Sequence, residues 1–132
     1  MSTTTQVSPA SKPMLWTGRI LIGLVTVFML FDAGIKIVQA KPAMEGTVKL
    51  GYQPSVVLPL GIVALACIVL YAIPRTSVLG AILLTAYFGG ATATQVRVQD
   101  PSFLFPVVIG GLAWLGLFLT DERLRNLIPI RR

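Results

Sequence analysis

The chain has 132 residues, of which 55% are hydrophobic and only 12% are charged, and its mean hydropathy is +0.80. An ordinary soluble domain carries roughly 25% charged residues, so this composition excludes a soluble globular protein and favours a membrane protein of one domain. The net charge is +6, but the cations separate apolar runs instead of clustering with aromatic residues. We interpret them as topology signals and expect no nucleic-acid partner.

The histidine and cysteine content excludes several kinds of site. The chain has no histidine and one cysteine, Cys67, in the middle of an apolar run. Histidine-ligated haem, zinc centres, disulfides and nucleophiles paired with histidine need residues that this chain lacks. We interpret Cys67 as a small buried apolar residue, with a reactive thiol as the alternative. We expect no metal site and no catalytic residue set, so any redox chemistry would need a partner or a bound organic cofactor.

The N-terminal region divides into a tail and a first span. Residues 1–13 are rich in serine and threonine and are predicted to form a disordered tail. Residues 14–132 form the predicted transmembrane domain, whose first span covers residues 15–37. A cleaved signal peptide is the competing interpretation, because Val38-Gln39-Ala40 resembles a cleavage site. The length of the segment and the charged pair ahead of that site argue against it.

That charged pair, Asp32 and Lys36, stands at the end of the first span. The two residues are four apart and hence lie on one face of a helix. Asp32 follows Arg19 by about 20 Å of helix, so it is still inside a ~30 Å hydrocarbon core if Arg19 marks one boundary. A charge near the bilayer centre costs about 2.5 kcal/mol or more, which makes the pair the first candidate for a functional site.

The later part of the chain contains three more apolar runs. The corresponding spans are predicted at residues 56–73, 78–95 and 103–119. Residues 41–54 form a connection that has room for a short helical turn at 42–46, and Pro74-Arg75 is a tight turn. The predicted fold is therefore all-α, a four-helix transmembrane bundle of two antiparallel hairpins.

Two patterns bear on how the spans pack. The motif Pro-Ser-x-x-x-Pro begins at Pro54 and again at Pro101, which indicates either two related hairpins in the same orientation or a coincidence in a proline-rich chain. Small residues recur along the third span around Gly89 and Gly90 and along the fourth span at Gly110, Gly111 and Gly116, and such residues allow close helix approach in lipid. We therefore expect the third span at the centre of the bundle, with a homodimer interface as the alternative.

Four spans place both termini on one side of the membrane. That side holds Lys12, Arg19, Arg75, Arg123, Arg125, Arg131 and Arg132, and the other side holds Lys36, Lys41, Lys49 and Arg97. The positive-inside rule then places both termini in the cytoplasm and the polar end of the first and third spans outside it.

The polar residues at this outer end form the candidate binding site. The candidate ligand-binding residues are Asp32, Lys36, Glu45, Tyr52, Thr94, Gln95 and Arg97. In the functional interpretation they line a small outward-facing cavity for an amphipathic or anionic molecule, or for a proton relay. In one alternative, Asp32 and Lys36 only neutralise each other while Lys36 extends to water. In another, these residues contact a partner protein.

Several segments together carry a family resemblance. They are Leu30-Phe31-Asp32-Ala33-Gly34-Ile35-Lys36, Glu45-Gly46, Leu50-Gly51-Tyr52, Leu70-Tyr71-Ala72-Ile73-Pro74-Arg75-Thr76, Leu79-Gly80-Ala81-Ile82-Leu83-Leu84-Thr85-Ala86-Tyr87-Phe88-Gly89-Gly90-Ala91 and Arg97-Val98-x-Asp100-Pro101. With these segments the chain resembles the DoxX-like family of small bacterial four-helix membrane proteins over residues 15–130. The resemblance implies a multi-pass protein of the bacterial inner membrane, with kinship to DoxX subunits associated with quinone-linked oxidoreductases. It implies no single activity.

One position departs from the family pattern. Members often have Ala-Thr-His where this chain has Ala93-Thr94-Gln95. A glutamine side chain can hydrogen-bond but cannot titrate, so we expect binding at this position and no proton shuttling.

The leading functional hypothesis is an accessory membrane protein that binds a small hydrophobic or quinone-like ligand, or a redox partner. Asp32 would be the anchor, and Lys36 and Arg97 its electrostatic partners. The alternatives are a membrane component of a quinone-linked oxidoreductase, in which Asp32 exchanges protons, and a purely structural or assembly subunit. Solute transport ranks last, because the inner halves of the first, second and fourth spans are almost wholly apolar. The bilayer is the expected environment, and a redox or assembly partner and a homo-oligomer are left open.

Overall fold

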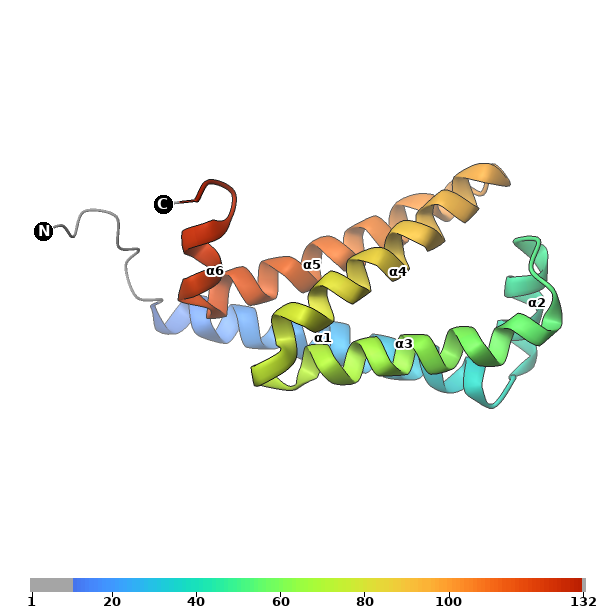
Figure 1. Ribbon diagram of the computed structural model, residues 1–132, viewed down its shortest axis with the longest axis horizontal. Helices are drawn as coiled ribbons and strands as arrows, with labels where there is room; N and C mark the ends of the chain where they lie inside the picture. The colour runs from blue at the N-terminus through green and yellow to red at the C-terminus, as the bar shows by residue number, and fades with distance from the viewer. Residues whose placement is uncertain (1–10, 132) are drawn as a thin grey trace, which may run out of the picture.

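The computed structural model describes residues 11–131, and its regular structure in that part of the chain is helical (Figure 1). The four long helices are α1 (Lys12–Ile37), α3 (Val57–Ala72), α4 (Ser77–Arg97) and α5 (Leu104–Thr120). The two short helices are α2 (Lys41–Lys49) and α6 (Glu122–Leu127). Three 3-10 turns precede α3, α4 and α5, and they are η1 (Pro54–Val56), η2 (Pro74–Thr76) and η3 (Pro101–Phe103).

The long helices form a four-membered ring. Helix α1 packs against α3 and α5, and α4 packs against the same two helices, so α1 and α4 face each other across a diagonal. Four helical segments of the described chain are long and apolar enough to cross a membrane. The predicted four-helix bundle of two hairpins is confirmed. The start of α1 and helix α6 lie at one end of the bundle, called the α6 end below, and α2 lies at the other, the α2 end (Figure 1).

Proline and capping residues set where the helices begin. Ser11 caps α1 by accepting a hydrogen bond from the backbone N–H of Met14 at 3.3 Å. Pro59 and Pro106 fall in the first turns of α3 and α5, where the backbone N–H groups have no partner within the α-helix, so the proline rings are tolerated. Both copies of the Pro-Ser motif fold as a 3-10 turn that leads into a span.

The helix boundaries agree closely with the predicted spans, with three differences. Helix α1 begins at Lys12 instead of residue 15, and residues 1–10 of the predicted tail lie outside the described residues. The connection at 41–54 contains a nine-residue helix, α2, which is longer than the predicted turn. Helix α6 was not predicted; its cap is Asp121, whose Oδ1 accepts from the backbone N–H groups of Arg123 at 2.9 Å and Leu124 at 3.3 Å.

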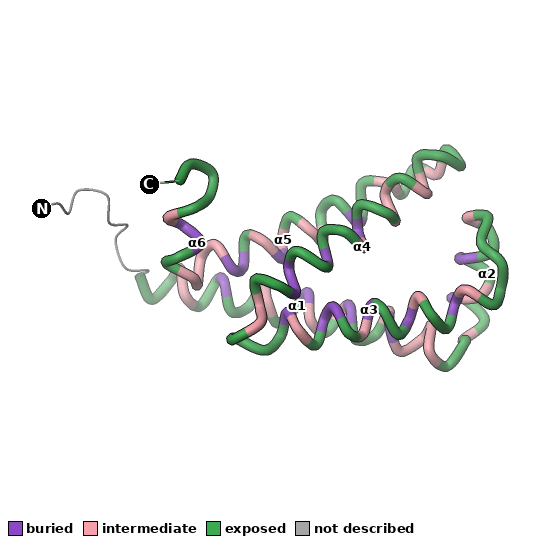
Figure 2. Tube along the Cα trace, viewed as in Figure 1, coloured by how far each residue is buried: buried purple, intermediate pink, exposed green. Residues whose placement is uncertain are grey.

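Apolar side chains fill the centre of the ring. The largest of those that are fully buried are Tyr71, Met29, Ile68, Leu84 and Val57. The Tyr71 hydroxyl donates to the Ala113 carbonyl of α5 at 2.8 Å, which satisfies it inside the bundle. Cys67 is only 5% exposed and is one of the core residues, as predicted. In Figure 2 much of the outward surface of the long helices is exposed. It includes many large apolar side chains, as is expected of helices surrounded by lipid.

Of the glycines predicted to allow close helix approach, Gly116 does so, whereas Gly89 and Gly90 do not. A Cβ on Gly18 of α1 would lie 2.8 Å from the carbonyl oxygen of Gly116 in α5, and Gly61 of α3 is equally close to α1. Gly80 of α4 comes closer still to the backbone of Tyr71 in α3. A Cβ on Gly89 or Gly90 would meet nothing within 4 Å. Each long helix has two neighbours in the ring, so the prediction that the third span is central is wrong. Small residues can recur on any face of a helix, and their spacing alone does not show which face is packed.

Candidate functional site

Asp32 and Lys36 lie one turn apart on the same face of α1, as their spacing predicts. The Lys36 ammonium donates to Asp32 Oδ2 at 2.7 Å. The same nitrogen donates to the hydroxyl oxygen of Tyr87 at 2.7 Å. These three side chains, called the triad below, therefore form one hydrogen-bonded group with the ammonium between its two partners.

The triad crosses the bundle from one side of the ring to the other. Helices α1 and α4 are diagonal partners, and Tyr87 lies halfway along α4. Asp32 is one turn deeper in the bundle than Lys36, about 6 Å along α1. The Lys36 ammonium thus reaches back into the bundle, and not outward to water as the alternative of simple neutralisation expects.

The packing around Lys36 shelters the ion pair from solvent. The side chain of Lys36 is 16% exposed and that of Asp32 is 27% exposed, and Ala33 between them is fully buried. Gly61 of α3 makes this packing possible, because a Cβ there would lie 2.8 Å from the Cβ of Lys36. An ion pair in such a sheltered place interacts more strongly than one on a wet surface.

The triad keeps hydrogen-bonding capacity that its members do not use on one another. An ammonium has three N–H donors, and two of those of Lys36 go to Asp32 and Tyr87. Among the described residues, nothing donates to Asp32 Oδ1 and nothing accepts the hydroxyl hydrogen of Tyr87. One N–H, one O–H and one carboxylate oxygen are therefore free to bind a polar group that both accepts and donates.

Tyr87 is absent from the predicted site residues, although it completes the triad. A tyrosine inside an apolar run resembles any packing aromatic. The position of Tyr87 halfway along a membrane span could have identified it. A hydroxyl at that depth has no water to bind in the hydrocarbon and needs a partner within the protein. The charged pair of the first span is the partner that the structure supplies.

A second polar group lies at the α2 end and is called the rim cluster, consisting of Leu50, Tyr52, Thr94 and Arg97. The Arg97 guanidinium donates to the Leu50 carbonyl at 2.8 Å. The hydroxyls of Tyr52 and Thr94 are 2.9 Å apart. Because the Thr94 hydroxyl donates to the Gly90 carbonyl at 2.8 Å, Tyr52 is the donor in this pair. The rim cluster therefore ties the segment after α2 to the last turn of α4.

The two remaining predicted site residues form no side-chain hydrogen bond or ion pair with either group in the described part of the chain. Gln95 Oε1 is buried, and no hydrogen-bond donor meets it in the described part of the chain. Glu45 faces Lys41 at 3.9 Å, and both side chains are mostly exposed, at 67% and 85%. Within residues 11–131, no hydrogen bond or ion pair joins the triad to the rim cluster. The structure thus divides the predicted residues into an interior group, a rim group and two separate side chains.

Neither group is built for a metal ion. Among the described residues, no three cysteine, aspartate or glutamate side chains come together in a way that could hold one. The triad offers a single carboxylate, and its neighbours are an ammonium and a phenol. Its hydrogen-bonding groups instead suit a small organic ligand with a polar head.

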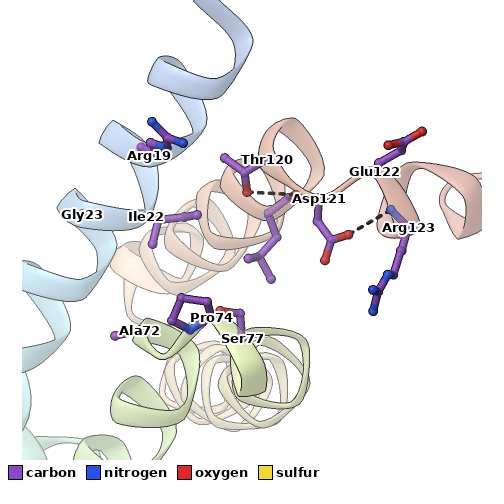
Figure 3. A pocket seen from close by; sticks show the side chains of 11 residues that line it. Arg19, Ile22, Gly23, Ala72, Pro74, Ser77, Thr120, Asp121, Glu122 and Arg123 are labelled. Atoms are coloured by element: carbon purple, nitrogen blue, oxygen red, sulfur yellow. Dashed lines mark hydrogen bonds between the residues drawn. The ribbon is translucent and has the colours of Figure 1, made fainter. Parts of the chain in front are cut away.

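A cavity of about 700 Å³ at the α6 end was not predicted (Figure 3). It is bounded by three segments that are distant in sequence: α1 near Arg19, the α3–α4 turn near Pro74, and the junction of α5 and α6 at Asp121. Two arginines line it, Arg19 and Arg123. Sequence patterns could not find this cavity, because it exists only where the three segments meet.

Comparison with known protein families covers most of the chain. The model of the DoxX-like family matches residues 20–116. This range includes all of the triad and the rim cluster, and it ends before α6. No curated protein and no solved structure matches the chain.

Proposed function

The chain belongs to the DoxX-like family and is an integral membrane protein, and we propose that it binds a small hydrophobic molecule with a quinone-like head at the triad. The observation that carries this proposal is the Lys36 ammonium between Asp32 and Tyr87 within the spanning helices. Ionisable groups inside a membrane span are costly and mark functional sites by default.

The free hydrogen-bonding groups of the triad match both forms of such a ligand. A quinone carbonyl accepts hydrogen bonds, so it can take the hydroxyl hydrogen of Tyr87 or the third N–H of Lys36. The hydroxyl of the reduced form donates, so it can bind to Asp32 Oδ1. The same three side chains can therefore hydrogen-bond to the oxidised and to the reduced molecule without carrying electrons themselves.

The rim cluster has a different role in this proposal. Its hydrogen bonds join Arg97 to Leu50 and Tyr52 to Thr94, across the gap between α4 and the segment after α2. We assign it the task of holding that segment over the end of the bundle. Gln95, with its buried free acceptor oxygen, stays a predicted ligand contact, and Glu45 is a predicted contact at the outer surface.

We place the α2 end outside the cytoplasm, in the bacterial inner membrane. The excess of lysine and arginine at the α6 end supports this orientation through the positive-inside rule. Green fluorescent protein fused after Arg132 should then fluoresce in cells. Fluorescence from a fusion inserted in the α2 segment, with none from the C-terminal fusion, would reverse the orientation.

Direct binding to the purified protein tests the ligand proposal. The full chain is reconstituted in nanodiscs of quinone-free synthetic lipid, and decylubiquinone is titrated while the thermal midpoint and the bound mass are measured. We expect one molecule per chain. Removing one hydrogen-bonding group by Tyr87→Phe should weaken binding about tenfold, and Asp32→Asn should weaken it at least as much.

Tyr52→Phe is the matched control, because it also removes one hydroxyl that is hydrogen-bonded between segments. We expect it to bind like the unmodified chain. Equal effects of Tyr87→Phe and Tyr52→Phe, or no binding by the unmodified chain, would refute the proposal. Size-exclusion chromatography of each variant separates loss of binding from loss of fold.

A further inference from the structure

The α6 end contains two adjoining cavities that together form one hollow. The first, of about 700 Å³, is lined by α1, the α3–α4 turn and the junction of α5 with α6. The second, of about 470 Å³, shares Pro74, Asp121 and Arg123 with it and extends toward Arg75. We call the two together the α6-end hollow.

Three arginines surround the α6-end hollow: Arg19 on α1, Arg75 in the α3–α4 turn and Arg123 on α6. The ion pairs in the described part of the chain are Asp32–Lys36 and Lys41–Glu45, so none of these three guanidinium groups has a carboxylate partner there. The positive charge around the hollow is thus available to an external anion.

Two acidic side chains, Asp121 and Glu122, line the hollow with the three arginines and leave it a net charge of +1, but neither forms an ion pair with an arginine in the described part of the chain. Asp121 uses its carboxylate to cap α6, accepting from two backbone N–H groups. In Figure 3 the side chains of Glu122 and Arg123 leave α6 in opposite directions, with Arg123 on the side of Pro74 and Ser77. The hydroxyl of Ser77 donates to the Ile73 carbonyl at 2.9 Å, so its hydrogen is already used. The guanidinium groups are therefore the donors that an anion would meet.

The α6-end hollow lies at the depth of the membrane surface. Arg19 lies level with the ends of the other spans, because it shares a cavity with the α3–α4 turn and with Thr120 at the end of α5. Its guanidinium stacks on the ring of Trp16 at 5.8 Å, and tryptophan is enriched at this interface. Ile22, Ala72 and Leu117 give the same hollow an apolar wall. It thus combines cations at headgroup level with apolar surface.

We propose that the α6-end hollow binds the phosphate of an anionic phospholipid, with Arg19 and Arg123 as the phosphate ligands and Arg75 beside them. Arginine suits this ligand because its planar guanidinium donates two parallel hydrogen bonds to phosphate oxygens. Basic pockets between transmembrane helices are known to take lipid headgroups. The apolar wall around Ile22 then receives the start of an acyl chain. This site is separate from the triad and does not depend on the ligand proposed there.

Lipid binding in neutral detergent tests the proposal without a bilayer surface potential. The full chain in dodecyl maltoside is titrated with dioleoylphosphatidylglycerol, dioleoylphosphatidylcholine or glycerol 3-phosphate, and the thermal midpoint and the lipid retained in native mass spectrometry are measured. We expect phosphatidylglycerol to raise the midpoint and to stay bound, and the other two probes to do neither. The double variant Arg19→Gln/Arg123→Gln should weaken phosphatidylglycerol binding at least about tenfold.

The control variant Lys41→Gln/Lys49→Gln removes the same charge from the opposite end and should bind like the unmodified chain. Arg19→Lys/Arg123→Lys should recover part of the binding, which shows that the loss is not a folding defect. Equal binding of phosphatidylcholine, or an equal loss in the Lys41/Lys49 variant, would overturn the proposal. Binding of glycerol 3-phosphate as tight as that of the lipid would overturn the assignment to a lipid, in favour of a free phosphate ester.

Discussion

The triad and the rim cluster use the same kinds of residue in different surroundings. Each contains a tyrosine hydroxyl and a cation that bridge segments distant in sequence, at distances of 2.7 to 2.9 Å. The triad lies between diagonal helices, with Lys36 only 16% exposed, whereas Tyr52 of the rim cluster is 37% exposed. Nearly identical geometry thus occurs once in a sheltered place and once at the surface.

The difference shows that burial, and not bond length, decides what these contacts contribute. At the surface, water replaces a lost partner, so a hydrogen bond there has a small net effect on stability. Inside the bundle water is scarcer, and the group left behind carries more of its desolvation cost. This difference favours the triad as the ligand site, because a ligand there can supply hydrogen bonds that water supplies at the surface. The rim cluster instead holds the segment after α2 against α4.

The largest expected effect comes from removing the carboxylate of the triad. Asp32→Ala leaves the Lys36 ammonium without its counterion and should lower the free energy of unfolding by about 2–4 kcal/mol, because breaking a sheltered ion pair strands one charge. The double variant Asp32→Ala/Lys36→Met removes both charges and should be more stable than the single one. Thermal unfolding in one detergent compares them. A single variant as stable as the double one would contradict a sheltered pair.

A smaller effect is expected from removing one tyrosine hydroxyl from each group, which compares the triad with the rim cluster directly. Tyr87→Phe should cost about 1–2 kcal/mol, since it removes a hydrogen bond to a charged group inside the bundle. Tyr52→Phe should cost about 0.5 kcal/mol or less, because water can hydrogen-bond to Thr94 instead. The thermal midpoints of both variants are measured side by side. If the two losses were the same, burial would not distinguish the clusters.

The smallest effect on global stability is expected at Arg97. Arg97→Gln should change the free energy of unfolding by no more than about 0.5 kcal/mol, yet it frees the Leu50 carbonyl and loosens the segment after α2. Limited trypsin digestion should then cut faster after Lys49, next to that carbonyl. Lys41→Gln, in the first turn of α2, is the control and should leave the rate of cleavage after Lys49 unchanged. An unchanged rate at Lys49 in the Arg97 variant would show that the rim cluster does not hold the segment.

The sequence was most informative where the relevant interactions are local. Asp32 and Lys36 could be paired from their spacing, because residues four apart on a helix are neighbours. The N-cap of α6 could also have been predicted, since Asp121 directly precedes the helix and accepts hydrogen bonds from backbone N–H groups within three residues. Tyr87 could not be assigned to Lys36, because 51 residues separate them and the packing of α1 and α4 against α3 and α5 determines how their side chains meet. The same holds for Gly18 and Gly116, whose contact depends on the angle at which α1 crosses α5.

By itself the sequence determined that four helices cross a membrane, in which order, and that one charged pair lies among them. It could do so because span length follows from bilayer thickness and a charge in lipid stands out against apolar neighbours. Only the tertiary structure decided which helices are diagonal, that Lys36 turns inward to Tyr87, and that three arginines surround a hollow at the α6 end. These features depend on how helix faces rotate toward one another, and in lipid that rotation is set by close packing between the helices and not by the hydrophobic pattern.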